Sequence, residues 1–132
     1  MVALDTARTA DDYRQCAEIL TKTHPNDLLP DFTDPHSITF IIFDAGDRSK
    51  VRGCIHTQVG PEVCCLAVDP DYRFQDASRA MLHQFSDAHF RTQNFRAVVH
   101  TVPKSNDQVR SMLKKSGAVE INKDDVRLRM AL

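Results

Sequence analysis

The sequence has no excess of charge, no long apolar run and little glycine. Its 17 basic and 18 acidic residues give a net charge of −1, and the basic residues are scattered along the chain. Nothing therefore favours binding to nucleic acid or to an acidic membrane surface. No segment approaches the roughly 18 apolar residues of a membrane span, and residues 1–12, MVALDTARTADD, are too polar for a signal peptide. We expect a cytoplasmic protein that binds neither nucleic acid nor membrane.

The four cysteines form no C-x-x-C pair. They are Cys16, Cys54, Cys64 and Cys65. Neighbours in a strand point to opposite faces, so Cys64 and Cys65 should not share a bonding partner. The pattern predicts reduced core cysteines in a reducing compartment.

The six histidines lack the spacing of metal ligands. His83 and His89 are six residues apart on an expected helix and do not share a face, while His56 and His100 are single residues of expected strands. Each is interpreted as a surface or hydrogen-bonded residue, so we expect no metal site.

What the chain does contain is an alternation of strand and helix patterns. Apolar, β-branched and aromatic runs predict strands, and helical spacing of apolar residues predicts helices. The expected strands are 2–5, 37–44, 51–58, 62–68, 95–102, 118–121 and 125–131, and the expected helices are 10–22, 77–92 and 106–115. Thr9 is the expected N-cap of the first helix and Gly117 the C-cap of the last. With 132 residues and no linker or repeat, the chain should form a single domain over residues 1–132.

The order of these elements predicts an α/β fold with a mixed sheet. Segment 62–68 is apolar on both faces, which favours a central strand. The strand–helix–strand crossover from 62 to 102 should give a central parallel strand pair, and hairpins should make the rest of the sheet mostly antiparallel. Helices are expected to flank the sheet. The last strand alternates basic and apolar residues, which favours a solvated edge strand over one that pairs across a dimer.

The loop DPDYRFQDASR, residues 69–79, joins the central strand to the next helix and has no glycine. Together with the element order, it resembles the Gcn5-related N-acetyltransferase (GNAT) family, whose pyrophosphate loop has the pattern Arg/Gln-x-x-Gly-x-Gly/Ala. The segment RFQDASRAML matches at Arg73, Gln75, Arg79 and the apolar pair Met81-Leu82, whereas Phe74, Asp76 and Ser78 stand where glycines usually stand.

A second stretch, NDQVRSMLKKSGAV, is similar to the family's N-x-x-A-x-x-L-Y-x-x-x-G-F. It matches at Asn106, Val109, Met112 and Gly117. Leu113 takes the place of the tyrosine that often serves as general acid, and Ala118 takes that of the final phenylalanine.

The resemblance implies a GNAT-like domain with acetyl-CoA as cofactor, its pantetheine arm along strand 62–68. The implied cofactor-binding residues are Val68, Arg73, Gln75, Ser78, Arg79 and Asn106. Glu62, at the start of the central strand, is the implied general base, and a solvated strand-end charge is the other interpretation.

The missing glycines predict a degenerate site. In such loops backbone N–H groups and a helix N-terminus wrap a pyrophosphate, and some positions need a positive φ, where a Cβ costs about 1–2 kcal/mol. Phe74 adds bulk, and Asp76 adds a charge whose repulsion weakens affinity by about three orders of magnitude at an effective dielectric of ~20. Asp76 or Ser78 is therefore interpreted as an ordinary helix N-cap.

The favoured hypothesis is a non-catalytic protein that acts through a protein partner. The stretch NDQVRSMLKKSGAVE is similar to glycine-poor GNAT-like proteins of short-tailed bacteriophages, which implies an accessory, assembly or virion-associated protein. The alternative is an active acetyl-CoA-dependent N-acetyltransferase that acts on a primary amine.

Overall fold

The computed structural model describes residues 2–58, 62–102, 107–121 and 127–132. Within these described ranges, three helices and seven strands follow one another nearly as the sequence predicts. They are β1 (Val2–Thr6), α1 (Ala10–Thr23), β2 (Ser37–Asp44), β3 (Val51–Gln58), β4 (Glu62–Val68), α2 (Gln75–Thr92), β5 (Ala97–Thr101), α3 (Asp107–Lys115), β6 (Val119–Glu120) and β7 (Arg127–Ala131).

The strands form one sheet in the order β1-β2-β3-β4-β5-β7-β6. Strands β4 and β5 are parallel, and every other neighbouring pair is antiparallel. The predicted fold class, a mixed and mostly antiparallel sheet with a central parallel pair, is therefore confirmed. One prediction was wrong: β7 is not an edge strand, because it pairs with β5 on one side and with the short β6 on the other.

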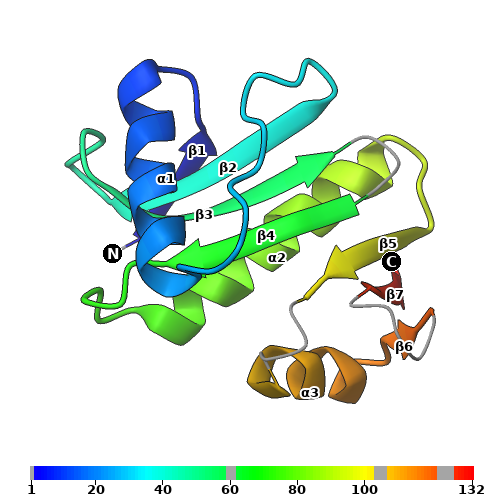
Figure 1. Ribbon diagram of the computed structural model, residues 1–132. Coiled ribbons are helices and arrows are strands. Elements are labelled where there is room, and N and C mark those ends of the chain that lie inside the picture. The colour runs from blue at the N-terminus through cyan, green and yellow to red at the C-terminus, as the bar shows by residue number, and fades with distance from the viewer. Residues whose placement is uncertain (1, 59–61, 103–106, 122–126) are drawn as a thin grey trace.

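Helices cover both faces of the sheet, α1 in front and α2 behind in Figure 1. Cys16, Ile19 and Leu20 of α1 pack in one core cluster with Ile41 and Cys54 of the sheet. On the other face, Leu82 and Phe90 of α2 pack against Phe40, Ile42 and Ile55. Helix α3 adds Leu113 to a smaller cluster with Val102 and Leu128. No helix among the described residues is both long and apolar enough to cross a membrane.

The face of α2 that packs on the sheet mixes polar and apolar residues. The helical spacing of apolar residues predicts Met81, Leu82, Phe85, Ala88 and His89 on one side; Leu82 is buried there and Met81 packs partly buried against the same core, but the other buried residues are Ser78, Ser86 and Phe90. Phe85 keeps 46% of its surface exposed. Because two of the four buried residues of α2 are serines, the spacing of apolar residues does not identify the whole buried face.

Helix α1 begins at the predicted cap. The Asp12 N–H donates to Thr9 Oγ1 at 3.0 Å, and the Thr9 N–H donates to Asp12 Oδ2 at 3.3 Å. These two bonds form a capping box, which satisfies two otherwise unpaired backbone donors.

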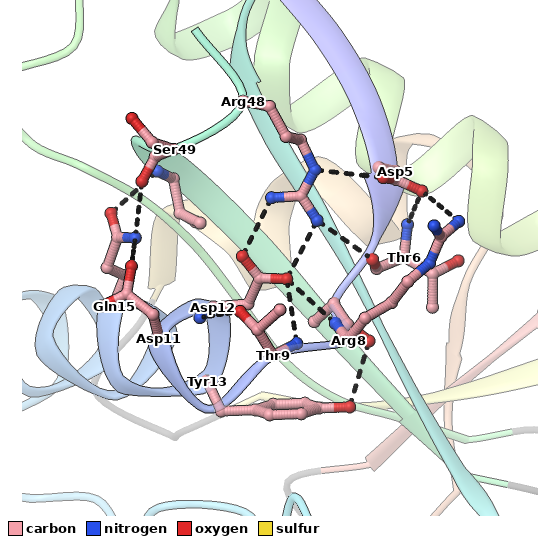
Figure 2. A network of polar contacts seen from close by, with 12 residues as sticks. Asp5, Thr6, Arg8, Thr9, Asp11, Asp12, Tyr13, Gln15, Arg48 and Ser49 are labelled. Atoms are coloured by element: carbon pink, nitrogen blue, oxygen red, sulfur yellow. Dashed lines mark hydrogen bonds and ion pairs between the residues drawn. The ribbon is translucent and has the colours of Figure 1, made fainter.

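Arg48, in the turn between β2 and β3, ties this cap to β1 (Figure 2). Its guanidinium donates to both carboxylate oxygens of Asp12 at 2.9 Å and to Asp5 Oδ2 at 3.1 Å. The Arg48 hydrogen bonds lower the pKa of Asp12 to about 2, against the opposing effect of burial. The network joins three segments that are distant in sequence.

Candidate functional site

A cleft opens where β4 and β5 separate. The two strands pair only at Glu62–Val99 and Val63–His100, and beyond these pairs they diverge, as Figure 1 shows. We call this point the β4–β5 fork. The cleft has a volume of about 570 Å³.

The cleft crosses the sheet at the fork, because its walls come from both faces. Its lining includes Leu20, Thr23 and His24 of α1, Asp27 and Leu28 of the following loop, Arg79 and His83 of α2, and Met112 and Leu113 of α3. Residues 63–68 of β4 and residues 100–102 line it between the two groups. The cleft therefore lies between α1 on one face of the sheet and α2 on the other.

Strand β4 carries an irregularity beside the fork. Cys65 lies opposite His56 and Val63 opposite Thr57, so Cys64 is an extra residue relative to β3. This two-against-one arrangement is a β-bulge, which leaves one residue out of the ladder and redirects its neighbours. The bulge occurs in the part of β4 that lines the cleft.

The N-terminus of α2 has no side-chain cap. Phe74 is the N-cap residue and makes no capping hydrogen bond. The interpretation of Asp76 or Ser78 as the N-cap was wrong: the Asp76 side chain is fully exposed, 3.8 Å from Arg79 Nη1, and the Ser78 N–H already bonds the Phe74 carbonyl within the helix. The first-turn N–H groups are thus not covered by a capping side chain, and such groups favour an anion.

The loop before α2 does not need glycine. Among the described non-glycine residues, Asn94 is the one with positive φ, so the predicted strain at Phe74, Asp76 and Ser78 is absent. The Phe74 ring packs edge-on against Tyr72 at 5.4 Å and beneath the Arg73 guanidinium at 4.6 Å. Its bulk is directed against neighbouring side chains of the protein.

The structure brings two of the predicted cofactor-binding residues to the cleft. Val68 and Arg79 both line it, and Arg73 is exposed nearby in the loop. The Gln75 amide instead donates to the Asp69 carbonyl at 2.5 Å and to the Tyr72 carbonyl at 2.7 Å, so it closes the loop on itself.

The remaining predicted cofactor-binding residues are Ser78 and Asn106. The Ser78 side chain is fully buried, and its Oγ has no partner among the described residues. Asn106 lies outside the described residues.

Solved structures with a similar fold include three from different organisms. The ribosomal-protein-S18-alanine N-acetyltransferase of Escherichia coli has a TM-score of 0.71 at 20% identity, covering 100% of this chain and 93% of its own. Tetrahymena GCN5 has 0.71 at 15% identity, covering 98% and 95%. PaiA N-acetyltransferase from Thermoplasma acidophilum, in complex with coenzyme A, has 0.71 at 11% identity, covering 98% and 99%. No protein-family model and no curated protein matches the sequence.

The chain has the GNAT fold. At these identities the likeness establishes the fold alone.

Glu62 stands at the closed end of the GNAT-fold cleft. Its Oε1 accepts a hydrogen bond of 3.1 Å from Thr101 Oγ1. Thr101 lines the cleft, whereas Glu62 is half-buried beside it and is not part of the lining. Thr101 therefore connects the Glu62 carboxylate to the lining of the cleft.

Neither of the two tyrosine hydroxyls is available to the cleft. Tyr13 donates to the Ala7 carbonyl at 3.1 Å. Tyr72 donates to Asp44 Oδ1 at 2.7 Å, and burial together with this bond raises its pKa to about 12. Leu113, at the position of the family's tyrosine, lines the cleft with an apolar side chain. The described lining of the cleft therefore contains no tyrosine.

The cleft is lined by cysteine and histidine side chains that the sequence patterns did not predict to lie together. Burial raises the pKa of Cys64 to about 11 and that of Cys65 to about 12, so both are thiols at neutral pH. All four cysteines are free, as predicted. His100 is not on the surface, and its Nε2 has no hydrogen-bond partner among the described residues, which corrects its interpretation as a surface or hydrogen-bonded residue.

No cluster of three or more histidine, cysteine or acidic side chains in the described part of the chain is arranged to hold a metal ion.

Proposed function

We propose that this GNAT-fold protein binds an acyl-CoA in the cleft at the β4–β5 fork and acylates a primary amine. The observation that carries the proposal is a cleft of about 570 Å³ that crosses the sheet beside an uncapped helix N-terminus. An elongated ligand with an anionic end fits a channel bordered by such an N-terminus.

The α2 side supplies the groups that an acyl-CoA requires. The free N–H groups of the first turn and the guanidinium groups of Arg73 and Arg79 offer hydrogen bonds and positive charge to a pyrophosphate. Strand β4, from Val68 back to the bulge at Cys64, offers backbone for the pantetheine arm. The bound thioester supplies an activated acyl group.

The α1 side suits a cationic acceptor. Asp27 and Leu28 line the cleft there, and Leu28 keeps 98% of its surface exposed. Asp31 and Asp34 follow in the same loop. A carboxylate beside an exposed leucine favours an ammonium group next to an apolar one. In this scheme Glu62 takes the proton of the amine through Thr101 or a water molecule.

A second candidate is the non-catalytic role, in which the fold acts through a protein partner in a phage particle or its assembly. Leu113 in the cleft and the distant tyrosine hydroxyls favour it, because general acid–base help is typically worth about 10²–10⁴-fold. The link to phages rests on the sequence resemblance of residues 106–120.

Thermal denaturation with acetyl-CoA tests the first proposal. A specific ligand at about 100 times its Kd adds about 2.7 kcal/mol of stability, and Arg79→Ala should reduce the shift more than Arg91→Ala, a control at the other end of α2. Thiol release in the presence of amines then separates transfer from binding alone. Absence of any shift at millimolar acetyl-CoA would exclude acyl-CoA binding and leave the non-catalytic candidate.

A further inference from the structure

Two imidazoles face each other in the cleft. His83 of α2 and His100 of β5 both line it, and their ring centroids are 5.3 Å apart at an interplanar angle of 57°. His100 keeps only 2% of its surface exposed. The pair lies outside every position that the family resemblance implied.

Each ring carries an unpaired nitrogen. Among the described residues, neither His83 Nδ1 nor His100 Nε2 has a hydrogen-bond partner. Burial lowers the pKa of both rings, that of His100 to about 4. Both imidazoles are therefore neutral at pH 7, and each offers one donor and one acceptor. Buried polar atoms without partners are rare and unfavourable in native proteins, so the pair needs an explanation.

The order of groups along the wall matches one class of ligand. Arg79 precedes His83 by one helical turn, about 6 Å along α2, and lies toward the uncapped N-terminus. His100 pairs with Val63 at the closed end of the fork, next to the bulge. From the helix N-terminus inward, a ligand meets positive charge first, then two neutral hydrogen-bonding rings.

We propose that His83 and His100 are hydrogen-bonding contacts for the acyl-pantetheine arm of an acyl-CoA and hold its thioester end at the β4–β5 fork. The proposal rests on the proposed function. The arm carries amide and thioester carbonyl groups, which can satisfy the unpaired ring nitrogens. Two imidazoles without a third ligand do not suit a metal ion.

Isothermal titration with acetyl-CoA at pH 7.5 tests the pair in the full chain. His100→Leu and His83→Leu remove the unpaired nitrogens, and His100→Gln and His83→Asn replace each with an amide nitrogen at similar reach. His89→Leu is the matched control, because His89 is on the same helix but packs against Phe40, outside the cleft lining. Melting without ligand is measured for every variant.

We expect each leucine variant to bind acetyl-CoA about fivefold to tenfold more weakly, the effect of one lost hydrogen bond, while it melts at or above the wild-type temperature. The amide variants should recover most of the affinity. If the wild type binds and the leucine variants bind equally well, or merely melt lower, the pair is structural and this inference is wrong although the proposed function stands. If the wild type does not bind acetyl-CoA, both are wrong.

Discussion

Thr101 Oγ1 donates a 3.1 Å hydrogen bond to Glu62 Oε1, and this contact joins β5 to β4 at the closed end of the cleft. Thr101 lines the cleft and Glu62 does not. The hydroxyl of Thr101 therefore connects the Glu62 carboxylate to the cleft and is placed to hold that carboxylate in one orientation.

Glu62→Gln separates the base from a structural charge. If Glu62 takes the proton of the amine, kcat/KM should fall by about 10²-fold or more, while the Kd for acetyl-CoA stays unchanged, because the side chain is outside the cleft lining. Steady-state thiol release and titration measure the two quantities. Glu18→Gln, an exposed change on α1, is the control. If turnover is unaltered, Glu62 is not the general base and is instead a solvated charge at the end of a strand.

Asp76→Asn should tighten acetyl-CoA binding only slightly. The Asp76 carboxylate is fully exposed, and in water two unit charges ~4 Å apart interact weakly, by about fivefold in an equilibrium constant. The gain should therefore be about fivefold or less and should disappear at high ionic strength. Titration at two salt concentrations measures it. A gain of a hundredfold would restore the view that this carboxylate blocks the site.

The loop before α2 shows that a sequence motif can lose its glycines without strain in the backbone. Three residues replace glycines there, yet Asn94 is the one non-glycine residue with positive φ in the described ranges. The sequence reveals a missing glycine but not whether the backbone needs one. By contrast, Thr9 and Gly117 marked helix ends correctly, because capping depends on neighbours within a few residues.

Acid should weaken the fold through Asp12. Its folded pKa is about 2, against an ordinary value of 3.8, because Arg48 binds the charged form. A lowered pKa contributes stability that is fully present above about pH 4 and is lost as the pH falls through 2, here about 2 kcal/mol. Urea unfolding at a series of pH values measures this loss.

Arg48→Met should destabilise the fold by about 3 kcal/mol, because it leaves the buried Asp12 carboxylate without its charged partner. The acid-dependent loss should also shrink, since the pKa of Asp12 then returns toward its ordinary value. Arg14→Met, which breaks only exposed pairs with Asp11 and Glu18, should cost less than about 1 kcal/mol. Equal costs for the two variants would contradict the role given to Arg48.

Gly53→Ala should destabilise the protein by overpacking. A Cβ at this position in β3 would lie 2.9 Å from the Ala67 carbonyl oxygen and 3.0 Å from Ile42 Cδ1. Backbone cannot move aside as a flexible side chain can, so the expected cost is about 1–3 kcal/mol. Chemical denaturation measures it. A fully stable variant would show that β3 and β4 can separate without loss.

The histidine pair and the bulge mark the limit of sequence reasoning about the site. His83 and His100 meet only because the crossover from β4 to the parallel strand β5 runs through α2, and no local pattern indicates that contact. The extra residue at Cys64 is equally hidden, because its neighbours read as an uninterrupted strand. The strands themselves were predictable from apolar and β-branched runs, whereas contacts between side chains distant in sequence were not.

Leu113→Tyr distinguishes a slow enzyme from a binding protein. Leu113 lines the cleft and is buried, so a tyrosine there introduces a phenol where neither natural tyrosine hydroxyl is available. If the chain transfers acyl groups, the added proton donor should raise kcat by about 10-fold or more, at an overpacking cost of about 1–3 kcal/mol. Leu113→Phe, which adds the same ring without the hydroxyl, should lower stability by the same amount and leave kcat unchanged. Because the two variants differ by one oxygen, a gain shared by both would point to cleft shape, and turnover absent from both, with acetyl-CoA bound, would favour the non-catalytic candidate.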